Sequence, residues 1–156
     1  MKSIYKIYTY LIVVICFLSI SACQSITEAK LAQSYKSNAP LINSYWKMLE
    51  VNKQTILVSE GQREAFIQLR HNNKIKGFTG CNHITGSYSV NTTSSQQTLR
   101  FNKINTTEKF CTEGMELQTS IAPMLQKVNS YKISGDSLFL YNKNNDVIAK
   151  LASIYF

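Results

Sequence analysis

Residues 76–88 read Lys76-Gly77-Phe78-Thr79-Gly80-Cys81-Asn82-His83-Ile84-Thr85-Gly86-Ser87-Tyr88. The glycines of this segment give the backbone the freedom, or the room for close approach, that a tight connection between two strands needs. Asn82 can form hydrogen bonds to the local backbone in such a turn, and Cys81 can join the turn to Cys111. The segment therefore predicts a structural junction rather than an active site.

The chain on either side of this segment is typical of short strands separated by polar turns. The strand-like runs are Trp46–Val51, Ala65–Arg70, Lys74–Phe78, Gly86–Val90, Thr98–Ile104, Ser130–Ile133, Ser137–Tyr141 and Val147–Tyr155. Short connections without a βαβ rhythm favour antiparallel pairing. We predict an α+β, mainly β fold, namely a small antiparallel β-barrel or strongly curved sheet of about eight strands, with one helix that closes one opening.

One segment has the period of a helix, and its apolar residues would gather on one face. These residues are Leu117, Ile121, Met124, Leu125 and Val128. Pro123 lies among them, so either the helix is kinked or a short helix begins near Ser120 with the proline in its first turn. The face that carries Ile121, Leu125 and Val128 is a possible groove for a partner.

The N-terminus has the pattern of a secretory signal. Lys2 and Lys6 precede the apolar run Leu11–Leu18, which is shorter than the about 20 residues of a membrane span. Ile20-Ser21-Ala22-Cys23 resembles the bacterial lipobox, and the resemblance implies cleavage before Cys23 and lipid attached to that cysteine. Gln24 follows rather than Asp, which by the same resemblance implies sorting to the outer membrane, facing the periplasm. A retained signal anchor is the alternative.

These patterns predict three parts of the chain. Residues 1–22 are a cleaved signal peptide, residues 23–42 are the lipidated Cys23 and a flexible tether, and residues 43–156 form one domain. The chain has a net charge of +8, but its basic residues are scattered along the sequence. Scattered charge speaks against a nucleic-acid partner. It fits a mild attraction to anionic lipid or polysaccharide, or an ordinary solvated surface.

Cys81 and Cys111 remain once the signal peptide is removed and Cys23 is lipidated. Outside the cytoplasm an even pair is most often a disulfide. One alternative is a reactive or redox-active thiol at Cys81 with His83 as its base, because residues two apart on a strand share a face. Structural zinc is another, although further ligands at metal-binding spacing are missing. We expect no metal, no cofactor and no catalytic residue, since no motif of nucleophilic or phosphate-binding chemistry is present.

Residues 76–88 resemble the signature of the META domain, the family of the heat-inducible lipoprotein HslJ. The positions that carry the resemblance are Gly80, Cys81, Asn82, Gly86 and Tyr88 in this segment, and Thr107 and Cys111 further along the chain. The order of strands and helix also agrees from about Tyr45 to Ile154. His83 and Ile84 depart from the residues that are common there, namely Arg and an aromatic. Members are associated with heat or envelope stress and with resistance to hydrophobic antibiotics such as novobiocin, and their fold resembles that of the pilotins of type III secretion.

Three hypotheses of function follow. The first is a non-enzymatic outer-membrane lipoprotein that supports envelope integrity, or stress and antibiotic tolerance, by binding another envelope protein or lipid. The second is a pilotin-like chaperone that escorts a secretin or an assembly subunit to the outer membrane. The third is an enzyme or redox protein that uses Cys81.

Overall fold

The computed structural model describes residues 38–155 except 59, 94–96 and 113. The predicted signal peptide, Cys23 and residues 24–37 of the predicted tether lie outside the described residues. Within the described part of the chain, no helix is both long and apolar enough to cross a membrane.

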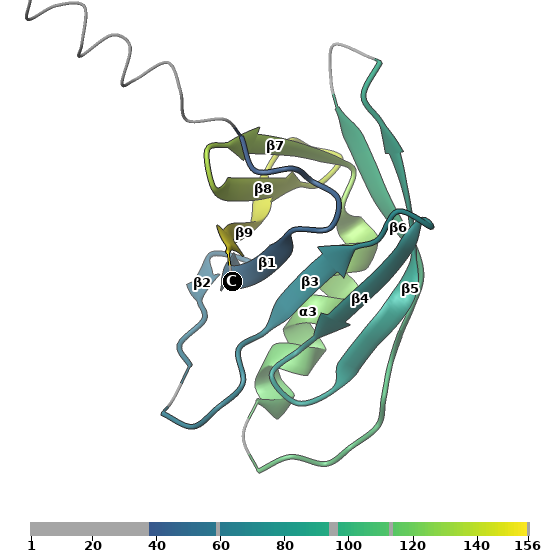
Figure 1. Cartoon of the computed structure of the whole chain (residues 1–156). Helices are drawn as coiled ribbons and strands as arrows, with labels where there is room; N and C mark the ends of the chain where they lie inside the picture. Colours follow the sequence, from purple (N-terminus) through teal and green to yellow (C-terminus); the bar gives the residue numbers. More distant parts are fainter. Residues whose placement is uncertain (1–37, 59, 94–96, 113, 156) are drawn as a thin grey trace, which may run out of the picture. The chain divides into compact units, whose positions relative to one another are not determined.

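The described residues form one antiparallel sheet that closes on itself, with a helix against it (Figure 1). The strands are β1 (Tyr45–Val51), β2 (Gln54–Thr55), β3 (Phe66–Leu69), β4 (Lys74–Phe78), β5 (His83–Asn91), β6 (Thr98–Thr106), β7 (Ser130–Ser134), β8 (Ser137–Tyr141) and β9 (Val147–Ile154), and the helix is α3 (Met115–Lys127). Their order is β2-β1-β3-β4-β5-β6-β7-β8-β9, and β1 also pairs with β9. The predicted mainly β barrel with one helix is therefore confirmed. The two-residue strand β2, an appendage on β1, was not predicted.

The barrel is held together by the alternation of apolar residues along its strands. In β1 the buried residues include Trp46 and Met48, and in β8 they are Leu138 and Leu140. Successive side chains of a strand point to opposite faces, so this alternation fills the barrel interior and leaves the outer face polar. The core is continuous from β1 through the sheet to the buried face of α3.

The strand pairing of the ring is shortest between β6 and β7, which pair at a single position, Thr98 with Ser130. Beyond this pair β6 continues to Thr106, whereas the chain on the other side leads back into the C-terminal end of α3. The helix packs against β6 and also contacts β1, which lies opposite in the ring. Beyond Thr98, β6 therefore has the end of the helix beside it rather than β7.

The helix settles both questions that its sequence left open. It begins at Met115, so the short helix from Ser120 is wrong, and Pro123 lies in its interior. Pro123 is exposed, where water can bond the carbonyl that the missing N–H leaves free. Ile121, Leu125 and Val128 have exposed fractions of 0%, 0% and 5%. The prediction of a partner groove on this face is therefore wrong, because the face packs into the protein's own core.

The domain begins earlier than predicted. The backbone N–H of Ala39 donates to Gly135 O at 3.0 Å, and Gly135 N–H donates to Asn38 Oδ1 at 2.8 Å. The indole N–H of Trp46 donates to Leu41 O at 3.0 Å. Residues 38–42, predicted as the end of a flexible tether, are therefore part of the fold, because the sheet offers them hydrogen bonds and Ala39 is buried.

Gly77 in β4 has no room for a side chain. A Cβ at this position would lie 2.6 Å from the backbone oxygen of Phe66, which the pairing of β3 with β4 holds in place. We expect Gly77→Ala to lower the free energy of unfolding by about 1–3 kcal/mol through overpacking. The measurement is urea denaturation, with Lys76→Ala as the exposed control on the same strand, for which a change within about 0.5 kcal/mol is expected. Equal values for the two variants would contradict the close approach.

Candidate functional site

The signature segment forms a buried turn between β4 and β5 that is centred on Asn82, which has an exposed fraction of 0%. The Asn82 side chain pairs with both peptide groups of Lys109, accepting from its N–H at 2.8 Å and donating to its oxygen at 2.9 Å. It also donates to Gln118 Oε1 on α3 and accepts from Thr107 Oγ1 at 2.6 Å. One side chain thus connects the turn, the segment after β6 and the helix.

The neighbouring signature residues complete this junction. Thr107 Oγ1 accepts from the backbone N–H of His83 at 3.1 Å while it donates to Asn82. Thr79, which is also buried, has a hydroxyl oxygen that accepts from the N–H of Asn82 at 2.9 Å. Gly80 has a φ of +100° and lies against Gly114 at the start of α3, where a Cβ on Gly114 would come within 2.8 Å of Gly80 O. The junction therefore uses its polar groups internally.

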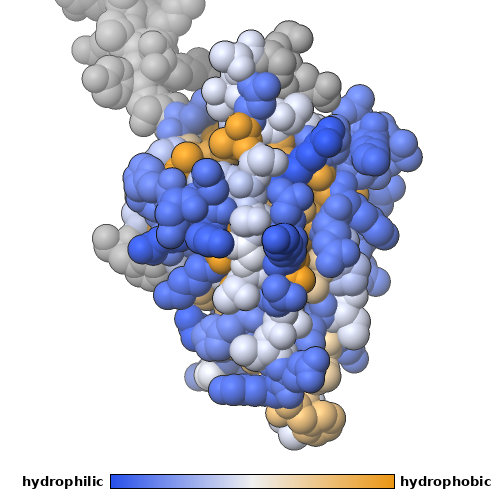
Figure 2. Space-filling model, turned by 90° about the vertical axis from the view of Figure 1, so that its right-hand side faces the viewer, coloured by the Kyte–Doolittle hydropathy of each residue, from blue (hydrophilic) through white to orange (hydrophobic). Residues whose placement is uncertain are grey.

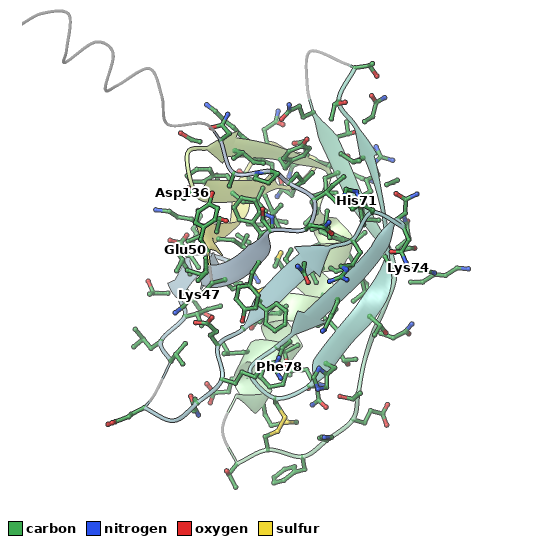
Figure 3. All side chains as sticks on the ribbon, viewed as in Figure 1. Lys47, Glu50, His71, Lys74, Phe78 and Asp136 are labelled. Carbon is green, nitrogen blue, oxygen red and sulfur yellow. A yellow bond between two sulfur atoms is a disulfide. The ribbon has the colours of Figure 1, made fainter. Side chains whose placement is uncertain are left out.

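Cys81 and Cys111 form a disulfide, so the predicted pairing is confirmed (Figure 3, yellow bond). It joins the turn before β5 to the segment that precedes α3, and Cys81 is buried. His83 is exposed, and its ring lies 5.5 Å from the Phe78 ring. Because the Cys81 sulfur is bonded to Cys111, this arrangement does not form the thiol–imidazole pair of the reactive-cysteine alternative. Among the described residues, no three His, Cys, Asp or Glu side chains lie close enough together to hold a metal ion.

Gly86 and Tyr88 are placed in β5 for reasons of packing. Gly86 lies at a register shift between β5 and β6, and a Cβ there would come within 2.9 Å of Lys103 O. The hydroxyl of Tyr88 donates to Arg70 O at 2.8 Å, and burial raises the pKa of this phenol above its usual value. Every position of the predicted signature therefore has a structural role.

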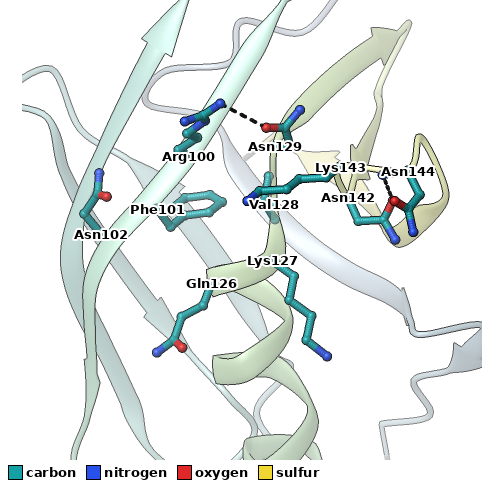
Figure 4. Close-up of a pocket in the computed structure, with 10 residues that line it drawn as sticks. All are labelled: Arg100, Phe101, Asn102, Gln126, Lys127, Val128, Asn129, Asn142, Lys143 and Asn144. Carbon is teal, nitrogen blue, oxygen red and sulfur yellow. Dashed lines mark hydrogen bonds between the residues drawn. The ribbon is translucent and has the colours of Figure 1, made fainter.

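A cleft opens where β6 and β7 separate, and we call it the seam cleft (Figure 4). It has a volume of about 510 Å³ and is lined by Arg100, Phe101, Asn102, Gln126, Lys127, Val128, Asn129, Asn142, Lys143 and Asn144. These residues come from β6, the C-terminal end of α3 and the turn between β8 and β9. Arg100 donates to Asn129 Oδ1 at 3.2 Å, and Asn142 is held by the backbone N–H of Asn144 at 2.9 Å.

The lining of the seam cleft is basic and rich in carboxamides. Arg100, Lys127 and Lys143 carry its charges, and none of its lining residues is acidic. In Figure 4 the Arg100 and Lys143 side chains come from opposite sides of the cleft, whereas Lys127 points away from it at the rim. Such a lining can bind anionic or hydroxyl-rich groups, but it holds no pair of groups suited to general acid–base catalysis.

Comparison with known families supports the resemblance of the signature. The family model of the META domain matches residues 39–153. The chain belongs to the META domain family. The match begins in the segment that packs onto the barrel ahead of β1. Curated proteins gave no match to the chain.

The META domain fold also occurs in a solved structure, the NMR structure of a protein from Burkholderia xenovorans. The two have a TM-score of 0.56 and are 19% identical, over 74% of this chain and 85% of that chain. At this identity the similarity concerns the fold alone.

A second group of side chains, aromatic and charged, lies where β1, β3 and β4 run side by side in this META domain. The Tyr45 and Phe66 rings stack at 4.2 Å, and the Arg63 guanidinium lies 4.8 Å from the Phe78 ring centre. Burial, with the nearby Glu64 carboxylate, raises the pKa of Tyr45 to about 12. These side chains pack onto the sheet through their rings. Elsewhere, on the face that Figure 2 shows, hydrophilic residues predominate and apolar residues appear only in small separate groups.

Sequence reasoning missed the seam cleft of this META domain and several partners of Asn82. Arg100, Lys127 and Lys143 are too far apart in sequence to form a motif. Gln118 carried no signal, because a single glutamine on an expected helix is usually solvated. The cleft residues come together only in the folded chain, at the place where β6 and β7 separate.

Proposed function

We propose that this META domain protein is a lipid-anchored, non-enzymatic binding protein of the bacterial cell envelope. Lipid on Cys23 anchors it in the outer membrane with its domain facing the periplasm. There it supports envelope integrity under stress by binding another envelope component. The lipobox-like sequence Ile20–Cys23 supports the anchor. The Cys81–Cys111 disulfide fits a compartment outside the cytosol, where such bonds persist.

The observation that carries the binding role is a contrast between two groups of polar residues. The signature residues around Asn82 satisfy one another inside the fold, whereas the cations and carboxamides of the seam cleft face an open space. Stabilisation of the fold explains the first group, and recognition of a ligand explains the second. An escort role for a secretin relied on a groove at Ile121 and Leu125, and the burial of both residues removes that argument.

The membrane anchor can be tested at its attachment residue. We expect Cys23→Ser to abolish the incorporation of labelled palmitate and to remove the protein from the outer-membrane fraction, because two or three acyl chains are needed for stable anchoring. Cys16→Ser, in the apolar run of the signal, is the matched control and should be labelled like the wild type. Unchanged labelling of the Cys23 variant would refute the anchor.

The role in envelope integrity can be tested in a strain that lacks the protein. We expect this strain to be more sensitive to detergent and to novobiocin at raised temperature. The wild-type protein should restore tolerance, and the Cys23→Ser variant should not. If the deletion leaves both sensitivities unchanged, the proposed role is wrong.

A further inference from the structure

The seam cleft lies where the pairing of β6 with β7 stops and the C-terminal end of α3 lies beside β6 instead. Strand β6 has β7 beside it only at Thr98, and from Arg100 onward its open side faces the end of the helix and the turn between β8 and β9. Leu99 N–H donates to Asn129 O across the seam. Peptide groups two residues apart on a strand face the same side, so those of Phe101 are directed toward the cleft as well. The cleft is thus a consequence of the fold and not of a loose surface loop.

The charges in the cleft have no ion-pair partner among the described residues. Within the part of the chain that the structure describes, Arg100, Lys127 and Lys143 form no ion pair, although Lys47 elsewhere pairs with Glu64 at 2.6 Å. The carboxylate of Asp146 lies next to the cleft wall, where it accepts from Asn142 Nδ2 at 2.9 Å and helps to close the turn. It does not line the cleft.

The end of α3 opposes these cations only weakly. A helix C-terminus carries about half a negative elementary charge, and Val128 N–H already bonds one of the last carbonyls, that of Leu125. Arg100 and Lys143 each carry a full positive charge, and Lys127 lies in the last turn itself. The net positive charge of these groups favours the binding of an anion in the cleft.

The uncharged part of the lining points to sugar hydroxyls. Among its carboxamides, Asn102, Gln126 and Asn144 have side chains that bond to no described residue. A carboxamide both donates and accepts, which suits hydroxyl groups that do the same. The floor is formed by Phe101 and Val128, which are buried and apolar. Because Phe101 has an exposed fraction of only 6%, its ring offers little surface on which nucleic-acid bases could stack.

We propose that the seam cleft binds an anionic oligosaccharide, whose acidic group lies between Arg100 and Lys143 and whose hydroxyls bond to the carboxamides. The volume of about 510 Å³ lies within the range of about 300–1,000 Å³ that is usual for ligand sites. The inference rests on the proposed function, and it names the chemistry of the envelope component that the proposed function leaves open. Carboxylated and phosphorylated glycans share this chemistry.

The test is calorimetric titration of the purified, detergent-solubilised lipoprotein with four probes. Tetragalacturonate carries carboxylates, trehalose 6-phosphate carries a phosphate, maltotetraose is neutral, and inorganic phosphate has no sugar. We expect at least one acidic sugar to bind about tenfold or more tightly than maltotetraose and than inorganic phosphate. Its affinity should fall as salt is added. The acidic sugar that binds more tightly identifies the acidic group.

The variant Arg100→Gln with Lys143→Gln should weaken this binding by about tenfold. Its control is Lys74→Gln with Lys76→Gln, which removes the same charge from exposed positions of β4 outside the cleft. Both variants should retain the circular dichroism and melting temperature of the wild type, because all four residues are exposed. Three results would each overturn the inference: no acidic sugar binds, maltotetraose or inorganic phosphate binds as tightly, or the control loses as much affinity as the cleft variant.

The deletion strain separates this inference from the proposed function. If the wild-type protein restores detergent tolerance and the cleft variant does not, both stand. If both restore it, sugar binding in the cleft is not what supports the envelope role, which remains, and the titration decides whether the inference holds. If neither restores it, the envelope role fails, and the titration alone decides whether the cleft binds an acidic sugar.

Discussion

Replacement of Asn82 by alanine is expected to lower the free energy of unfolding by about 2–4 kcal/mol, since each lost hydrogen bond contributes about 0.5–1.5 kcal/mol. The Asn82 side chain bonds both peptide groups of Lys109, the hydroxyl of Thr107 and the amide of Gln118. Alanine removes all of these bonds at once and leaves a void at a fully buried position. The turn, the segment after β6 and the helix would lose their common connection.

Urea denaturation followed by the fluorescence of Trp46 measures this effect directly, because Trp46 is the only tryptophan of the chain and is fully buried. Asn105→Ala is the matched control. Asn105 is exposed, and its side-chain amide makes one bond, to Lys103 O at 3.1 Å. Its loss should cost less than about 1 kcal/mol. Equal losses for the two variants would show that Asn82 is not the centre of the junction.

Loss of the disulfide is expected to destabilise the domain by a similar amount. Cys81 and Cys111 are separated by 30 residues, and a closed loop of this length contributes about 3.5 kcal/mol in the chain-entropy model. The loop contains β5 and β6, so the bond restricts the unfolded state across the centre of the sheet. We therefore expect Cys81→Ser with Cys111→Ser to unfold at clearly lower urea concentration than the oxidised wild type.

A reducing agent provides the control for this pair of substitutions. It should bring the wild type to the stability of the double variant and should leave the double variant itself unchanged. If reduction does not alter the unfolding midpoint of the wild type, the disulfide contributes nothing to stability. The losses from Asn82→Ala and from the cysteine pair should not add, because both act on the same turn.

Local sequence patterns were sufficient for the architecture. The strand alternation seen in Thr98–Ile104 and the short polar turns predict an antiparallel mainly β domain, because burial of one sheet face imposes a period of two. The spacing of Leu117, Ile121 and Leu125 predicts the helix, and the glycines with Cys81 predict the junction. These features depend on neighbours in the chain, and the structure confirms the sheet, the helix and the disulfide.

Only the tertiary structure decided what each apolar or charged pattern faces in the folded protein. An apolar helix stripe has the same sequence whether it faces a partner or its own sheet, and only the packing of α3 against β6 and β1 showed that Ile121 and Leu125 are core residues. Likewise, Arg100 and Lys143 are scattered charges in the sequence, and they come together only where β6 is no longer paired with β7. Periodicity reports which residues are to be buried together, whereas a site built from distant segments depends on where the sheet closes.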